Sequence, residues 1–123
     1  LARTCKKVTA SEISRDSIAL AKRMGLENVN WIASASEGLL FRLKERYDTI
    51  LVDPPRTGLD KKVTDFIKNS GAKTVVYISC SPDTLARDLK RLSEKYSVEK
   101  LDIVDMFPGS YHVESCCLLK LNA

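Results

Sequence analysis

The chain has 123 residues, 44% of them hydrophobic and 29% charged, which suits one globular domain with a modest core. No apolar run approaches the ~20 residues of a membrane span, and the first residues lack the apolar block of a signal peptide, so we expect a cytoplasmic protein with no membrane partner. The net charge of +4 is compatible with a polyanionic partner and equally with simple solubility.

The first part of the chain predicts strands and helices in alternation. Residues 8–13 are compatible with a strand, and Ser14 is a candidate N-cap for a helix that Gly25 suits at its C-terminal end. Residues 29–33 predict a second strand, and residues 36–46 predict a second helix from leucines on one face.

The remainder continues the alternation and ends in two strands. A continuous apolar run that ends in an acid predicts a buried parallel strand, and a second run of this kind follows one helix later. Ser81 and Pro82 suit the N-cap and first position of the next helix. The expected strands are residues 49–53, 74–80, 98–107 and 115–121, and the expected helices are residues 60–70 and 82–96.

This order predicts an α/β fold with a mostly parallel sheet covered on both faces. The connection at residues 108–114 is short enough for the last two strands to pair antiparallel. Ligands of such sheets bind beyond the carboxyl ends of the strands, where Asp53 and Cys80 are expected. The five glycines are isolated and form no glycine-rich turn, so we infer that a first strand and its loop lie upstream.

Four cysteines are present, and Cys80 is the one in a chemically suggestive position. It ends a strand and precedes a helix N-terminus, whose dipole favours a thiolate. The alternative is a buried, inert cysteine. Cys116 and Cys117 occupy an apolar run and point to opposite faces if it is a strand. The spacing fits no zinc pattern, and we expect no metal site.

Two further stretches combine polar and aromatic groups. Asp53-Pro54-Pro55-Arg56-Thr57-Gly58 places an acid after a buried strand, and its prolines stiffen the exit. This acid either accepts hydrogen bonds from a ligand or is solvated in a rigid turn. Residues 105–114 bring Phe107, Tyr111, His112 and Glu114 into one loop, with groups for acid–base chemistry and stacking.

Together, these three stretches resemble the signature motifs of the RNA uridine-5-methyltransferase family. The family carries Asp-Pro-Pro-Arg-x-Gly, then Tyr-x-Ser-Cys followed by proline and threonine, then Asp-x-Phe-Pro and His-x-Glu. All three occur here in that order. The resemblance implies a Rossmann-like, S-adenosylmethionine-dependent methyltransferase fold, of which residues 1–123 form the C-terminal portion without the first strand and glycine-rich loop.

The resemblance also implies residue roles, a cofactor and a partner. Cys80 is the nucleophile that adds to carbon 6 of uracil, and Glu114 is the base that removes the proton from carbon 5. The cofactor is S-adenosylmethionine, and the partner is structured ribosomal or transfer RNA. Glu12 and Asp53 match cofactor-binding acids, and the expected substrate-binding residues are Arg56, Phe107 and His112.

Two other functions remain open at this stage. A methyltransferase that modifies an exocyclic amine has a similar acid-Pro-Pro motif after the same strand. It needs no cysteine nucleophile, because the amine attacks the methyl group directly. The chain is alternatively an inactive fragment, or one that binds RNA or a protein partner, in which missing strands leave edges that favour self-association. Arg87, Lys90 and Arg91 form a basic helical face that either meets RNA phosphates or is solvated.

Overall fold

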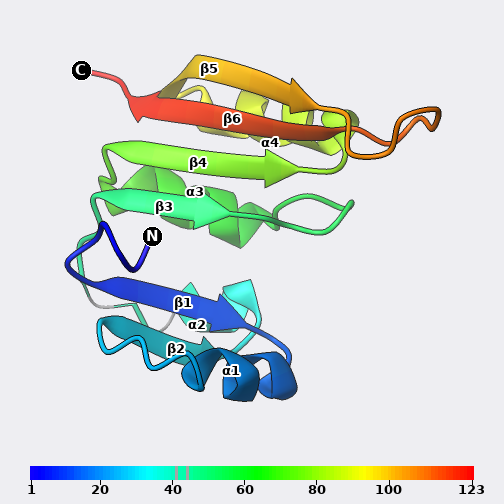
Figure 1. Ribbon diagram of the computed structural model, residues 1–123. Coiled ribbons are helices and arrows are strands. Elements are labelled where there is room, and N and C mark those ends of the chain that lie inside the picture. The colour runs from blue at the N-terminus through cyan, green and yellow to red at the C-terminus, as the bar shows by residue number, and fades with distance from the viewer. Residues whose placement is uncertain (41, 44) are drawn as a thin grey trace. The chain divides into compact units, whose positions relative to one another are not determined.

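The computed structural model describes every residue except 41 and 44 (Figure 1). The chain divides into two compact units, Leu1–Lys44 and Glu45–Ala123. Each unit contains its own sheet and two helices.

The first unit contains a parallel pair of strands and two helices. Strand β1 (Val8–Glu12) pairs with β2 (Val29–Ala33). Helix α1 (Arg15–Lys22) is capped by Ser14, whose side chain accepts a hydrogen bond from the Ser17 amide. Helix α2 (Ser36–Leu40) follows β2. The predicted Ser14 cap and the predicted strand at residues 29–33 are therefore confirmed.

The predicted helix over residues 36–46 is too long, because α2 ends at Leu40. Residues 41 and 44 lie outside the described part of the chain, and Arg42 and Leu43 are not helical. Gly38 weakens a helix at its centre by about 1 kcal/mol relative to alanine.

The second unit is a four-stranded sheet in the order β3-β4-β6-β5. Strands β3 and β4 are parallel, whereas β6 runs antiparallel to both β4 and β5. The predicted α/β class and the antiparallel pairing of the last two strands are thus confirmed. The strands are β3 (Thr49–Val52), β4 (Thr74–Ser79), β5 (Tyr96–Val104) and β6 (Glu114–Leu121), and the helices are α3 (Lys61–Ser70) and α4 (Pro82–Leu92).

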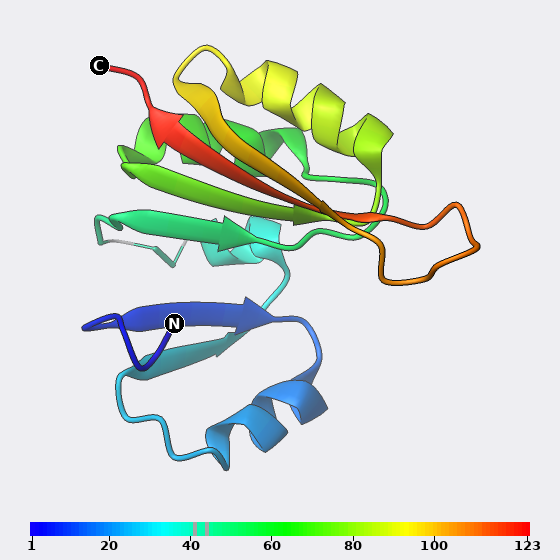
Figure 2. The same cartoon turned by 45° about the horizontal axis from the view of Figure 1, so that its top comes forward.

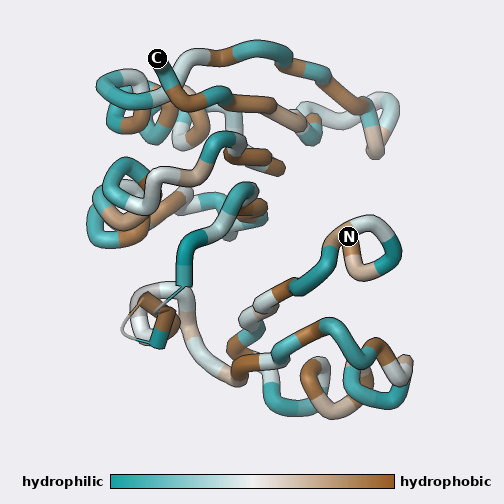
Figure 3. Tube along the Cα trace, turned by 90° about the vertical axis from the view of Figure 1, so that its left-hand side faces the viewer, coloured by the Kyte–Doolittle hydropathy of each residue, from teal (hydrophilic) through white to brown (hydrophobic). Residues whose placement is uncertain are grey.

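Helices α3 and α4 cover the same face of this sheet (Figures 1 and 2). Alternate residues of β4 and β6 are buried, as the period of two in a strand requires. Hydrophobic and hydrophilic stretches alternate along the chain trace (Figure 3). The core lies between the buried strand residues and the apolar sides of the helices. Its largest fully buried apolar residues are Tyr77, Ile67, Leu92, Leu119 and Val75.

The end of α4 differs from the sequence-based expectation. The helix stops at Leu92 instead of continuing to Tyr96, which is the first residue of β5. Tyr96 is buried, and its hydroxyl donates to the carbonyl oxygens of Ala72 at 2.8 Å and Ile67 at 3.2 Å. These tertiary contacts hold Tyr96 at the end of α3, so it does not extend the leucine pattern of α4.

The sheets retain open edges among the described residues, because β1 pairs only with β2 and β3 only with β4. The expected self-association rests on such edges and stays a prediction. In the described part of the chain, the helices are also too short and too polar to cross a lipid bilayer.

We expect Tyr96→Phe to lower the free energy of unfolding by about 1 kcal/mol, because a buried hydroxyl and its two acceptors lose their hydrogen bonds. Urea denaturation measures this change. Tyr111→Phe is the matched control, since the Tyr111 ring is 87% exposed, and it should leave stability unchanged. Equal stability of the two variants would contradict the anchoring role of Tyr96.

Candidate active site

A cavity of about 250 Å³ lies in the second unit and is lined by Arg56, Cys80, Phe107, His112 and Glu114. These five residues are the predicted catalytic and substrate-binding residues, and they come from three separate segments of the chain. The loop after β3 and the loop between β5 and β6 both lie beyond the carboxyl ends of β3 and β4 (Figures 1 and 2). The structure therefore assembles one site where parallel sheets bind ligands.

The register of the sheet brings Cys80 and Glu114 together. Strands β4 and β6 pair Ser79 with Ser115, so the next positions of the two antiparallel strands are Cys80 and Glu114. Ser79 and Ser115 are buried on the helix-covered face, and the residues beside them point to the other face. Both Cys80 and Glu114 are half-buried. The sulfur and the carboxylate thus share one face and one cavity.

The turn between β4 and α4 is fixed by Ser79. Its hydroxyl accepts a hydrogen bond from the Ser81 amide at 3.0 Å and donates to the Ser81 carbonyl at 2.9 Å. Ser81 occupies the N-cap position, as predicted, and Pro82 follows, but the Ser81 side chain makes no capping hydrogen bond. The N-terminal end of α4 therefore begins just beyond Cys80.

Arg56 and His112 contact each other across 56 residues of sequence. Nη2 of Arg56 lies 2.7 Å from Nδ1 of His112 and 3.5 Å from Nε2. A guanidinium group only donates hydrogen bonds, so Nδ1 must accept. The shorter contact is the one to Nδ1, so it favours a ring that carries its hydrogen on Nε2.

Aromatic rings surround His112. The Tyr111 ring is tilted against the imidazole with centroids 4.4 Å apart, and the Phe107 ring meets it edge-on at 6.5 Å. Phe107 is 60% exposed, so its ring does not belong to the hydrophobic core. Ser110 organises this loop, because its hydroxyl donates to the Phe107 carbonyl and accepts from the His112 amide. Ser110 is not among the residues predicted for the site.

The loop after β3 is held by the buried carboxylate of Asp88, a residue to which the sequence assigned no role. Asp88 in α4 is fully buried and accepts hydrogen bonds from the Leu59 amide at 2.7 Å and the Tyr77 hydroxyl at 2.8 Å. Burial, together with Asp88, raises the pKa of Tyr77, so its hydroxyl remains a donor at physiological pH. Arg87 and Arg91 complete the contacts of the carboxylate.

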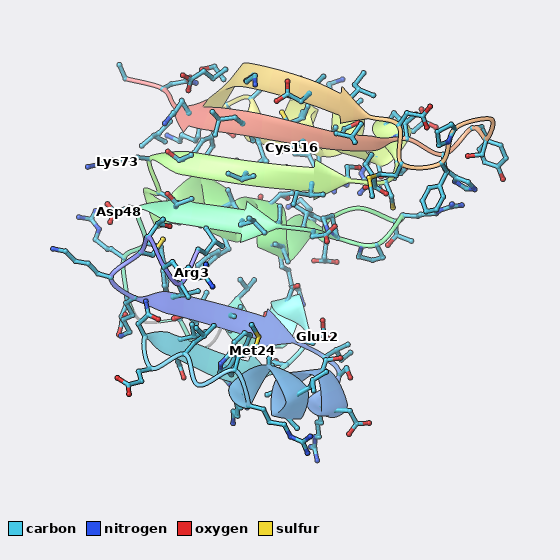
Figure 4. The ribbon with its side chains drawn as sticks, viewed as in Figure 1. Arg3, Glu12, Met24, Asp48, Lys73 and Cys116 are labelled. Atoms are coloured by element: carbon cyan, nitrogen blue, oxygen red, sulfur yellow. The ribbon has the colours of Figure 1, made fainter. Side chains whose placement is uncertain are left out.

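The predicted cofactor-binding acids lie in different units. Glu12 is exposed at the carboxyl end of β1, where its Oε1 accepts a hydrogen bond from the Ser14 amide at 2.9 Å (Figure 4). Asp53 is exposed directly after β3 and does not line the cavity of the second unit. Each acid therefore presents a carboxylate at the carboxyl end of a parallel strand.

The remaining cysteines of the second unit belong to β6, where Figure 4 labels Cys116. Cys116 is half-buried and Cys117 is fully buried, so the two point to opposite faces as expected for a strand. Burial raises the pKa of the Cys117 thiol, which keeps it protonated. Among the described residues, no group of three or more His, Cys, Asp or Glu side chains is arranged to hold a metal ion.

Comparison with known proteins gives a consistent match. The family model described as tRNA (Uracil-5-)-methyltransferase matches residues 1–122. An uncharacterized RNA methyltransferase of Fusobacterium nucleatum is 44% identical over 98% of this chain, and one of Listeria monocytogenes is 42% identical over 95%. The chain spans 28% and 27% of these two relatives, respectively.

Solved structures agree in fold. The chain superposes with a TM-score of 0.80 on the tRNA (uracil-54, C5)-methyltransferase of Pyrococcus abyssi in complex with S-adenosyl-L-homocysteine, at 31% identity over 97% of this chain and 30% of that one. The N-methyltransferase NodS of Bradyrhizobium japonicum matches with a TM-score of 0.74 over 100% of this chain and 70% of that one. Its identity of 15% supports a common Rossmann-like fold alone.

We expect Gly58→Ala to destabilise the second unit more than Gly109→Ala does. Both glycines have positive φ, 74° and 85°, so each alanine incurs about 1–2 kcal/mol of backbone strain. A Cβ at Gly58 would also lie 2.6 Å from Asp88 Oδ2 and Arg87 Nη2, whereas one at Gly109 meets nothing within 4 Å. Urea denaturation of the two variants measures the difference. Equal losses of unfolding free energy in the two variants would show that the structure around Gly58 accommodates a Cβ without strain.

Proposed function

The chain belongs to the tRNA (uracil-5-)-methyltransferase family, and we propose that it carries the catalytic residues of an enzyme that transfers a methyl group from S-adenosylmethionine to carbon 5 of a uridine in transfer or ribosomal RNA. The observation that supports this proposal best is the shared cavity of Cys80 and Glu114. The similar Pyrococcus abyssi enzyme is named for uracil C5 methylation, and the similar bacterial proteins are named as RNA methyltransferases.

Carbon 5 of uracil is a poor nucleophile, and the proposed role of Cys80 is to activate it. The Cys80 thiolate forms a bond to carbon 6, and the electrons of the carbon 5–carbon 6 double bond move toward oxygen 4 to give an enolate. S-adenosylmethionine would supply an electrophilic methyl group to the electron-rich carbon 5, with its sulfur–methyl bond breaking and S-adenosylhomocysteine as the leaving group. The product of this step retains its hydrogen on carbon 5 and its bond to Cys80.

Glu114 completes the reaction by removing that hydrogen as a proton. The electron pair of the carbon 5–hydrogen bond restores the double bond, and the bond between carbon 6 and sulfur breaks to regenerate the Cys80 thiolate. Nucleophile and base must therefore reach adjacent ring carbons. Their positions at the ends of paired strands, in the lining of one cavity, support these roles.

His112 and Arg56 are suited to stabilise the enolate. Because Arg56 occupies Nδ1, the remaining ring nitrogen of His112 carries a hydrogen that can be donated to oxygen 4. A fixed donor placed where negative charge develops lowers the barrier more than one that must reorient. Phe107, in the wall of the same cavity, offers an aromatic surface for the pyrimidine.

The RNA partner must present its uracil unpaired. The cavity volume of about 250 Å³ lies below the ~300–1,000 Å³ typical of pockets for drug-sized ligands, which suits a single flipped pyrimidine. Tyr111, 87% exposed beside His112, is available to stack on the bases that flank it.

The proposed cofactor contacts rest on the two exposed carboxylates, considered separately. Glu12 ends β1 and is held by the Ser14 amide through Oε1, so its carboxylate is oriented to accept hydrogen bonds from ribose hydroxyls. Asp53 follows β3 and offers an acceptor for amino or ammonium groups. S-adenosylmethionine has both kinds of donor, so the residues present fit it.

We expect Glu114→Gln to slow turnover by ~10²–10⁴-fold and to accumulate an RNA–protein adduct that survives denaturation, because the cysteine leaves only after the carbon 5 proton is removed. Denaturing gel electrophoresis with labelled RNA measures the adduct. Cys80→Ala should abolish both adduct and turnover, whereas Cys116→Ala, on the same strand as Glu114, should retain both. Turnover by Cys80→Ala would instead favour methylation of an exocyclic amine.

The proposed donation from Nε2 of His112 predicts unequal effects of two amide substitutions. Glutamine places its amide close to the position of Nε2, and asparagine places its amide close to Nδ1. We therefore expect His112→Asn to reduce kcat/KM for RNA methylation about 10- to 100-fold more than His112→Gln, the loss of one charge-assisted hydrogen bond. Equal activities of the two variants would contradict donation from Nε2.

A further inference from the structure

The Asp88 carboxylate is the most completely buried charged group described in the second unit, with 0% exposure. A buried carboxylate is tolerated only when its lone pairs are satisfied, and here both oxygens are used. Oδ2 accepts from the Leu59 amide and the Tyr77 hydroxyl, and Oδ1 accepts from Arg87 Nε at 3.0 Å and Arg91 Nη1 at 3.3 Å. Such a cluster has one low-energy arrangement.

The arginines of this cluster also bind backbone carbonyl groups of the loop after β3. Arg87 Nη2 donates to the Thr57 carbonyl at 2.9 Å, and Arg91 Nη1 donates to the Leu59 carbonyl at 3.3 Å. Gly58 lies between these two acceptors and packs so closely on Arg87 and Asp88 that a Cβ would overlap them. Amide and carbonyl groups of the loop are therefore bound on both sides of Gly58.

The residue just before this clamped segment is Arg56. Its backbone carbonyl accepts a hydrogen bond from the Thr84 hydroxyl at 3.0 Å, which ties it to the first turn of α4. Its side chain reaches His112 in the cavity. The backbone from which the guanidinium extends is thus fixed by α4, the helix that starts just beyond Cys80.

The cluster also accounts for much of the basic face on α4. Arg87 and Arg91 point to loop carbonyls and to Asp88, so their hydrogen bonds are committed to the protein. Lys90 is exposed on the same helix. The basic periodicity of α4 therefore supports the active-site loop, in addition to presenting charge to solvent.

We propose that Asp88 is a positioning residue for the methyl-transfer reaction, which acts through the loop at Thr57–Leu59 to hold Arg56 against His112. Asp88 does not line the cavity and does not touch the reacting atoms. Its contribution is the fixed placement of the Arg56 guanidinium, and through it the tautomer of His112. The effect of Asp88 on the rate of methylation rests on the proposed function. Its effect on the position of Arg56 does not.

A double-mutant cycle on the intact protein tests the proposal. We expect Asp88→Asn to lower kcat/KM for RNA methylation at least tenfold in the otherwise unchanged protein, but less than threefold when Arg56→Gln is already present. Lys62→Met, which removes a charge from an exposed position of α3, should stay within twofold. A tenfold loss in both backgrounds, or an undiminished kcat/KM in Asp88→Asn alone, would overturn the proposal.

Milder variants cover the case in which Asp88→Asn fails to fold. Thr84→Val removes one hydroxyl at nearly constant volume, and Arg87→Met removes the bond to the Thr57 carbonyl. Both should lower kcat/KM, and both losses should shrink in the Arg56→Gln background. Losses that multiply fully with Arg56→Gln would refute action through Arg56.

A second readout does not depend on activity. Nitrogen-15 shifts of His112, assigned by their absence in His112→Gln, report which ring nitrogen carries the hydrogen. We expect the Nε2-protonated tautomer in the unchanged protein and a mixture of tautomers in Asp88→Asn or Arg87→Met. Unchanged shifts would sink the proposal, whereas altered shifts in a protein that methylates no RNA would leave it standing and refute the proposed function instead.

Discussion

The antiparallel pairing of β4 with β6 is the constraint on which the candidate site depends. Ser79 and Ser115 face each other in this ladder, so the residues one step further, Cys80 and Glu114, are brought opposite each other at the strand ends. A slip of one residue would turn one of the two to the helix-covered face. The alternating burial of β4 and β6 opposes such a slip, because it would place core side chains in solvent.

Around this pair, the loops acquire definite positions by different means. The loop between β5 and β6 is organised locally, through Ser110 and the aromatic contacts of His112. The loop after β3 is organised from a distance, through Asp88 and the arginines of α4. Arg56 and His112 join the two loops. The candidate site thus combines two strand-end side chains, Cys80 and Glu114, with polar groups held by the helix that covers the opposite face.

The charged residues of α4 pair with one another because a buried charge is costly unless it is paired. A fully buried carboxylate requires donors, and the arginines at i−1 and i+3 supply them while spanning to the loop. From the helix alone, these arginines resemble a solvent-facing or phosphate-binding stripe. Only the packing of α4 beside the loop shows that their donors are directed to Asp88 and to backbone carbonyls.

The sequence by itself determined the α/β class, most element positions, the antiparallel end of the sheet and the residues of the cavity, because alternation, capping residues and motif order are local properties. The sequence pattern extended α2 and α4 beyond their observed C-terminal ends, because the leucine periodicity continues past both. In α4, the tertiary contacts of Tyr96 place this residue in β5 instead. The Arg56–His112 contact and the Asp88 cluster were decided only by the tertiary structure. Their partners lie 56 and 29 residues apart, and hydrogen-bond geometry at such separations is set by how strands and helices pack.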